Sequence, residues 1–134
     1  MFTNLYIGLL TLLYFKISLE TINARRSNKI SVGAGDNNEI AGIVSAHSNF
    51  NSYVPIFVVL LYLYETSDIA ASVIIHALGL SVLAGRYLHY IGIKDQRAQN
   101  FKFRVAGMRM TLIPMLILAI LNIAAFVYTT RIKG

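Results

Sequence analysis

Hydrophobic residues fall into four long segments along this chain, and polar residues gather between them. The segments run from about Phe2 to Ile22, Ile40 to Tyr64, Ile69 to Ile93 and Val105 to Tyr128. Each is close to the roughly 20 apolar residues that a helix needs to cross the hydrocarbon core of a bilayer. The pattern therefore predicts an all-α protein, in which a single domain of residues 1–134 crosses the membrane as a bundle of four helices.

The second segment differs from the others because its first half is polar. The stretch from His47 to Pro55 is rich in serine, asparagine and tyrosine. Hydrocarbon offers such groups no partners, so we expect them to face other helices, a ligand or the membrane surface. One helical face carries Ala41, Ser45, Ser48, Asn49 and Ser52. Small residues at this spacing favour close helix packing, whereas Asn49 also fits a ligand contact and Tyr53 fits an interfacial aromatic belt.

The composition supports the membrane interpretation and limits the possible chemistry. Hydrophobic residues make up 56% of the chain and charged residues only 13%, against about a quarter charged residues in soluble domains. The chain has no cysteine, which excludes disulfides, thiolate nucleophiles of its own and zinc–thiolate sites. In a membrane chain, the net charge of +6 indicates cytoplasmic loops and anionic lipid rather than nucleic acid.

The charges between the segments predict an orientation in the membrane. The first and third connections carry Arg25, Arg26, Lys29, Lys94, Arg97, Lys102 and Arg104, which are seven of the twelve basic residues. The turn between the second and third segments carries Glu65 and Asp68. The positive-inside rule places the basic connections in the cytoplasm, and both termini on the opposite side.

Basic side chains are the main candidates for chemistry. Four of them, Arg25, Arg26, Arg86 and Arg104, are expected at the cytoplasmic ends of three helices. Together they would hold a multiply anionic ligand and would favour the thiolate form of a bound thiol. Contacts with lipid head groups, or snorkelling in the case of Arg86, are the alternatives.

Other polar residues inside the segments give weaker indications. Arg109 lies deeper than Arg104 and needs a partner. Glu20 is expected to pair with Lys16, one helical turn away. The histidines are too far apart along the sequence for a metal pair, and no cluster has the spacing of a metal site.

Three patches of the sequence resemble the MAPEG family, the membrane-associated proteins in eicosanoid and glutathione metabolism. The end of the first segment, Ser18 to Arg26, resembles the same region of leukotriene C4 synthase and its bacterial relatives. Asn49 to Pro55 resembles the family signature Asn-x-x-Glu-Tyr-x-Pro. Arg86 to Gly92, followed by Phe103 to Met108, resembles the bacterial members at the third and fourth helices.

The resemblance implies a homotrimer of four-helix subunits, with glutathione bound between neighbouring subunits near the cytoplasmic surface. Arg25 or Arg26, Asn49, Tyr53 and Arg104 match positions that contact glutathione or its thiolate, and His89 falls where eukaryotic members have a contacting tyrosine. Arg104 is the predicted catalytic residue. Arg25, Arg26, Asn49, Tyr53, Arg86 and His89 are the predicted glutathione-binding residues.

Two departures from the family pattern leave the function open. Ser45 and Ser52 stand where the resemblance implies an arginine and a glutamate. Each lost charge-assisted contact costs about 1.5–3 kcal/mol. The leading prediction is a glutathione-dependent transferase or peroxidase acting on a lipophilic electrophile. The alternative is a non-catalytic lipid-binding or scaffold protein with a degenerate glutathione site. A small transporter is disfavoured, because broken helices and paired intramembrane acids are not apparent.

Overall fold

The computed structural model describes residues 1–35, 38–95 and 98–132, and every regular element within them is an α-helix. The helices are α1 (Thr3–Ser27), α2 (Asn38–Glu65), α3 (Ser72–Ile93) and α4 (Phe101–Ile132). Each coincides with one of the four apolar segments, which confirms the predicted all-α, four-helix architecture. Arg97, one of the basic loop residues, lies outside the described residues.

α4 begins four residues before the apolar segment that predicted it, at Phe101 rather than at Val105. Asn100 explains the difference, because its side-chain oxygen accepts a 3.1 Å hydrogen bond from the backbone N–H of Phe103. An asparagine in this position satisfies one of the free N–H groups at a helix start. Lys102 and Arg104 therefore lie on the first turn of a helix rather than in a loop.

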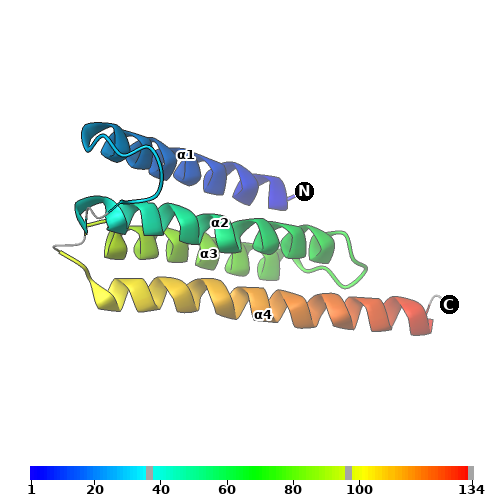
Figure 1. Cartoon of the computed structure of the whole chain (residues 1–134). Helices are drawn as coiled ribbons and strands as arrows, with labels where there is room; N and C mark the ends of the chain where they lie inside the picture. The colour runs from blue at the N-terminus through cyan, green and yellow to red at the C-terminus, as the bar shows by residue number, and fades with distance from the viewer. Residues whose placement is uncertain (36–37, 96–97, 133–134) are drawn as a thin grey trace.

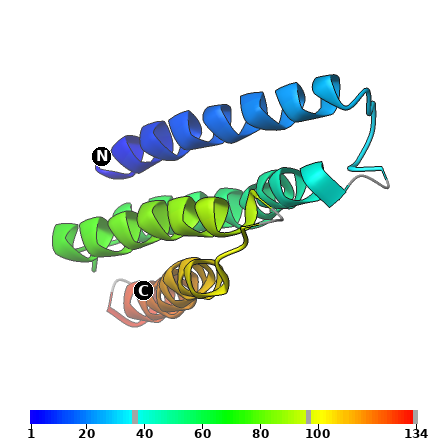
Figure 2. The same ribbon diagram turned by 90° about the vertical axis from the view of Figure 1, so that its left-hand side faces the viewer.

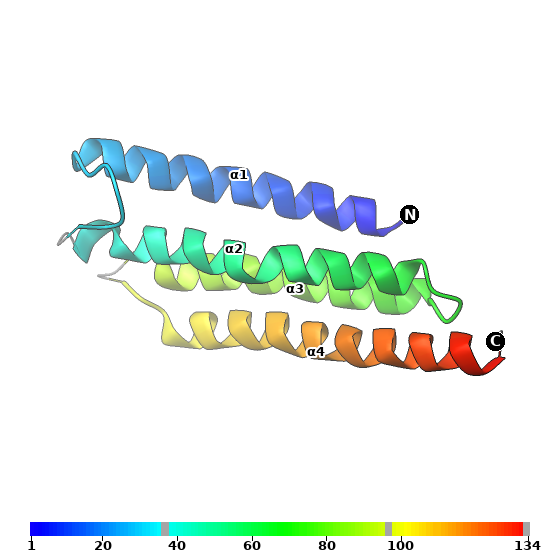
Figure 3. The same cartoon turned by 45° about the vertical axis from the view of Figure 1, so that its right-hand side comes forward.

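The helices run alternately in opposite directions, with α2 and α3 in the middle of the bundle (Figure 1). α1 and α4 lie on opposite sides of this pair, and their described residues do not contact each other (Figure 2). The α1–α2 and α3–α4 connections lie at one end, which we call the basic end; the α2–α3 connection and the N-terminus lie at the other end (Figure 3). The two basic connections thus share one end of the bundle, as the four-helix prediction requires.

α3 and α4 approach each other closely because glycines lie where they cross. A Cβ atom on Gly107 would lie 2.5 Å from the carbonyl oxygen of Gly85 and 2.6 Å from the backbone nitrogen of His89. A Cβ atom on Gly85 would lie 2.9 Å from the carbonyl oxygen of Gly107. Small residues often mediate the packing of membrane helices, because lipid tails are as apolar as the side chains and the hydrophobic effect does not drive association there.

α1 is attached to the bundle at its start by a carboxylate from α2. Glu65, the last residue of α2, accepts hydrogen bonds from the backbone N–H groups of Phe2 and Thr3, at 2.8 Å for Thr3. α1 has no side-chain cap of its own. The Glu65 carboxylate therefore satisfies free N–H groups at the start of α1 and complements the positive end of its dipole.

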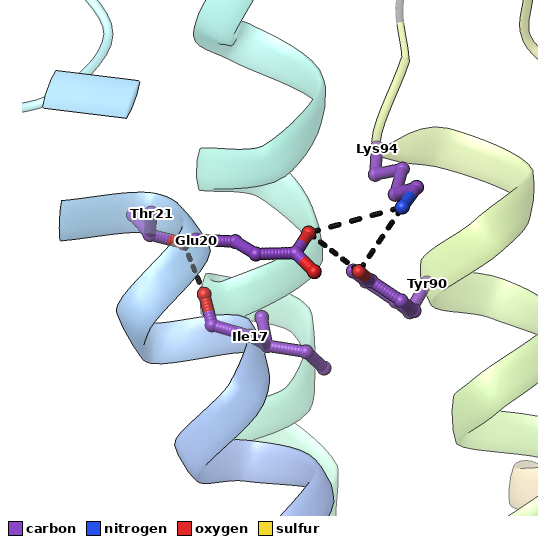
Figure 4. Close-up of polar contacts among 5 residues, drawn as sticks. All are labelled: Ile17, Glu20, Thr21, Tyr90 and Lys94. Carbon is purple, nitrogen blue, oxygen red and sulfur yellow. Dashed lines mark hydrogen bonds and ion pairs between the residues drawn. The ribbon is translucent and has the colours of Figure 1, made fainter. Parts of the chain in front are cut away.

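A second polar contact joins α1 to α3 near the basic end (Figure 4). The Glu20 carboxylate accepts a 2.5 Å hydrogen bond from the Tyr90 hydroxyl, and the same oxygen lies 3.8 Å from Nζ of Lys94. The expected pairing of Glu20 with Lys16 is wrong, because the Lys16 ammonium instead lies 5.5 Å from the centre of the Tyr90 ring. Tertiary packing brings Tyr90 and Lys94 to Glu20, and these contacts replace the local one.

Three of the helices described, α1, α3 and α4, are long and apolar enough to cross a membrane. α2 does not meet the same criterion, because polar residues occupy its first half. Its polar half nevertheless runs beside apolar helices in the centre of the bundle, where α1, α3 and α4 all contact α2. Protein groups can therefore satisfy some of the polar side chains of α2, whereas Ser45, Ser48 and Ser52 are exposed.

Candidate functional site

The guanidinium group of Arg86 lies inside the bundle, where α2, α3 and α4 meet. Arg86 is only 2% exposed. Its Nε donates a 2.8 Å hydrogen bond to the Thr111 hydroxyl, and Nη1 donates a 2.5 Å hydrogen bond to the side-chain oxygen of Asn49. The centre of the Tyr53 ring, one turn along α2 from Asn49, lies 5.6 Å from the guanidinium carbon. The structure thus brings together three predicted site residues, Asn49, Tyr53 and Arg86.

Three α4 residues in this network were not assigned to the site from the sequence. Nη2 of Arg86 donates to the carbonyl oxygen of Gly107 at 3.3 Å and to the sulfur of Met108 at 3.5 Å. The Thr111 hydroxyl donates a 2.9 Å hydrogen bond to the same Gly107 carbonyl oxygen. Thr111 could have been found, because a hydroxyl in an otherwise apolar membrane segment needs a partner. Nothing in the sequence pointed to the Gly107 carbonyl.

Arg86 is a buried cation whose partners are all neutral groups. Among the residues that the structure describes, no carboxylate contacts it. The alternative that Arg86 snorkels to the surface is wrong, because Thr111, Asn49 and Gly107 hold its guanidinium inside the bundle. These contacts offset part of the cost of a charge at membrane depth. We therefore interpret Arg86 as a positioning residue, which fixes Asn49 and Tyr53.

Asn49 and Tyr53 present hydrogen-bond donors next to this buried cation. The Asn49 oxygen accepts from Arg86, so its NH₂ group remains available to donate to a ligand. Both residues are half-buried. Tyr53 meets Arg86 through its ring, so its hydroxyl can donate to a ligand. Two donors beside a guanidinium form a site that suits the oxygen atoms or the sulfur of an anionic ligand.

His89 and Arg104 lie along the contact between α3 and α4, closer to the basic end. His89 is 3% exposed and packs against Gly107, so its ring offers little surface to a ligand. The Arg104 side chain is exposed. Its backbone packs against Gly92 of α3, since a Cβ atom on Gly92 would lie only 2.8 Å from the Arg104 backbone nitrogen. Arg104 is therefore the exposed cation of this part of the site.

Arg25 and Arg26 lie at the basic end as predicted, but on the other side of the bundle. They occupy the last turn of α1, and Nε of Arg25 donates a 3.0 Å hydrogen bond to the carbonyl oxygen of Gly33. Since α1 and α4 do not contact each other along the described residues, Arg25 and Arg26 do not meet Arg104 within one chain. A second copy of the chain would be needed to bring the two groups of arginines together.

Comparison with known proteins identifies the family. The model of the MAPEG family matches residues 3–124. The chain belongs to the MAPEG family. It is similar to the inner membrane protein YecN of Escherichia coli strain K12, with 30% identity over 123 residues, which covers 92% of this chain and 91% of YecN. The inner membrane protein YecN of Escherichia coli O6:H1 is similar to the same extent. The chain is therefore a multi-pass integral membrane protein of the MAPEG family.

This MAPEG protein has exposed serines at the two positions where the resemblance implies charges. Ser45 and Ser52 are exposed on α2, together with Ser48, to whose carbonyl oxygen the Ser52 hydroxyl donates a 3.0 Å hydrogen bond. We call Ser45, Ser48 and Ser52 the serine stripe. The stripe lies beside Asn49 and does not contribute to the Arg86 network.

The donors around Arg86 and Arg104 would suit the anionic groups of glutathione better than its ammonium group. The NH₂ group of Asn49, the hydroxyl of Tyr53 and the guanidinium of Arg104 are all donors. These groups suit carboxylates and a thiolate. With Ser52 in place of a glutamate, the signature segment offers only neutral oxygen atoms to an ammonium group. The fit is therefore partial, and it is strongest where negative charge has to be held.

Proposed function

We propose that this MAPEG protein is a glutathione-dependent transferase or peroxidase that acts on lipophilic electrophiles in the membrane. The observation that carries the proposal is the contact of Asn49 and Tyr53 with the buried Arg86. These donors on α2 therefore lie level with Gly107 and Thr111 of α4, which also contact Arg86. Exposed Arg104, one turn before Gly107, adds a free cation.

Each residue has a separate role in the proposed reaction. Asn49 and Tyr53 donate hydrogen bonds to the tripeptide, and Arg86 keeps them in position. The bound glutathione supplies the nucleophilic sulfur. The Arg104 guanidinium favours the charged form of that sulfur, because a neighbouring cation lowers the pKa of a thiol from its usual value of about 8.5. A hollow of about 210 Å³ between α1 and α2 is lined mainly by apolar side chains and would receive the lipophilic substrate. A neighbouring copy would have to bring its Arg104 to this hollow, because α1 and α4 of one chain do not contact each other along the described residues.

The proposal includes a homotrimer, and two exposed polar features support self-association. Arg109 is exposed on α4, between Gly107 and Thr111, which contact Arg86 inside the bundle. A charged side chain at membrane depth costs about 2.5–3.5 kcal/mol or more. The serine stripe is also exposed. It lies at a similar depth, since Asn49 beside it on α2 contacts Arg86 as well. A neighbouring copy would cover these groups and would bring its Arg25 or Arg26 to the site.

Replacing Arg104 with alanine tests the catalytic assignment. Adding glutathione to the purified protein at neutral pH should raise the ultraviolet absorbance of thiolate, and Arg104→Ala should abolish the rise because the stabilising cation is lost. Lys102→Ala is the matched control, since Lys102 is also exposed on the first turn of α4. An equal loss of the thiolate signal in both variants would contradict a specific role for Arg104.

A non-catalytic lipid-binding or scaffold role is the second candidate. Ser45 and Ser52 favour it, because they are exposed and neutral where charges would hold glutathione. The same titration separates the two functions, since this candidate predicts that glutathione binds without thiolate formation or does not bind. Calorimetric titration of the purified protein with glutathione measures the binding itself.

The orientation in the membrane is also a proposal, in which the basic end faces the cytoplasm and both termini face the opposite side. The chain lacks cysteine, so single cysteines can be introduced at the exposed positions Ser31 and Thr66 without background labelling. Impermeant thiol reagents applied to intact cells should label the cysteine at position 66 and should reach position 31 only after the membrane is opened. Labelling of both from one side would exclude this topology.

A further inference from the structure

A basic hollow lies beside the end of α1. It has a volume of about 420 Å³ and is lined by Ile22, Arg25, Arg26, Lys29, Ile30 and Ser31. Three of these six side chains are cationic, and the lining includes no acidic side chain among the residues described. The proposed glutathione site uses Arg25 or Arg26 but neither Lys29 nor Ser31. The hollow therefore has features that the proposed function leaves unexplained.

The backbone after α1 folds back and fixes the cations around the hollow. Ile30 donates a backbone hydrogen bond of 2.9 Å to the Arg25 carbonyl oxygen, and Lys29 donates one of 3.1 Å to the Arg26 carbonyl oxygen. These two bonds form a Schellman motif. Lys29 takes the left-handed position of the motif, with φ of 54°, where glycine is the usual residue. A lysine is thus held in a conformation that favours glycine.

An exposed apolar stripe runs along α1 towards this hollow. Leu12, Phe15, Leu19 and Ile22 are 68%, 61%, 44% and 44% exposed. They follow each other at intervals of three and four residues, so they share one face of the helix. Arg25 and Arg26 come three and four residues after Ile22 and continue the same face. α1 therefore presents an apolar track that ends at a group of cations at the basic end of the bundle.

We infer that the hollow binds the phosphate of an anionic phospholipid, whose acyl chain lies along the exposed stripe of α1. The cations complement the phosphate charge. The stripe complements the acyl chain, and Ile22 and Ile30 meet the region between head group and chain. This site goes beyond the proposed function, because it assigns Lys29 and Ser31 to a resident lipid rather than to glutathione.

Native mass spectrometry of the full chain, released from micelles containing equal amounts of phosphatidylglycerol and phosphatidylcholine, tests the inference. The wild-type protein should retain phosphatidylglycerol and not phosphatidylcholine. Lys29→Gly removes the cation and leaves the left-handed backbone position to the residue that prefers it. It should therefore lower the lipid affinity about fivefold, the effect of one basic residue near an anionic surface, while the unfolding temperature in lipid-free detergent does not fall. Lys102→Gln removes a charge from the same end of the bundle outside the hollow and should leave lipid retention unchanged.

Several results would overturn the inference. Equal retention of the two lipids, or equal losses in Lys29→Gly and Lys102→Gln, would show that only the overall charge matters. Displacement of the lipid by excess glutathione would assign the hollow to the tripeptide, and displacement by inorganic phosphate alone would show that the acyl chain contributes nothing. Failure of the proposed glutathione function would instead appear as an absent thiolate signal with lipid retention intact.

Discussion

Replacing Gly107 with alanine is expected to destabilise the folded protein by about 3 kcal/mol, the upper end of the usual cost of overpacking. The added methyl group would lie 2.5 Å from the Gly85 carbonyl oxygen and 2.6 Å from the His89 nitrogen. Both are backbone atoms, so no change of rotamer can relieve the overlap, and α3 and α4 must move apart. The Gly107 carbonyl also accepts a hydrogen bond from Arg86, so the separation would disturb the site. Circular dichroism during unfolding in detergent measures the loss of stability.

Gly8→Ala is the matched control for this prediction. A Cβ atom on Gly8 would have nothing within 4 Å, and Gly8 lies inside α1. Alanine is a better helix former than glycine by about 1 kcal/mol, so this variant should be as stable as the wild type or slightly more stable. If Gly107→Ala and Gly8→Ala are equally stable, α3 and α4 do not approach each other closely at Gly107.

Restoring both family charges, as Ser45→Arg with Ser52→Glu, is expected to tighten glutathione binding about a hundredfold or more. Two charge-assisted hydrogen bonds at about 1.5–3 kcal/mol each give a factor of this size. Both serines are exposed on α2, so the larger side chains fit on a single chain. The double variant should gain more than either single variant, since each new charge would meet the ligand and the other new charge. Calorimetry measures the affinity, and native mass spectrometry in mild detergent shows whether three chains stay together.

Ser48→Glu is the control for this second prediction, because Ser48 lies in the serine stripe but not at a family charge position. It should leave glutathione binding unchanged. If the stripe serves only to pack against another subunit, the double variant and Ser48→Glu would both dissociate the assembly, and neither would gain affinity. That outcome would favour the scaffold role over a weakened enzyme site.

The sequence by itself determined the helices and their order. Four apolar segments separated by polar connections leave few other ways to satisfy the backbone in a bilayer, since each spanning segment must form its own hydrogen bonds. The basic connections on either side of an acidic turn indicated which ends share one side of the bundle. The polar start of α2 marked Asn49 and Tyr53 as residues that need partners, because hydrocarbon offers them none. All of these inferences depend on local composition and spacing, which can be read from a single sequence.

Only the tertiary structure decided which side chains meet. Asn49 contacts Arg86 across 37 positions of the sequence, and Arg86 contacts Thr111 across 25. Glu20 contacts Tyr90 instead of Lys16 for the same reason, and Arg25 and Arg104 share one end of the bundle without meeting. Such contacts depend on the rotation of each helix about its axis and on which helices are neighbours. Close crossings such as that of Gly85 and Gly107 set these quantities, and the hydrophobic pattern of a helix that is apolar on most sides does not reveal them.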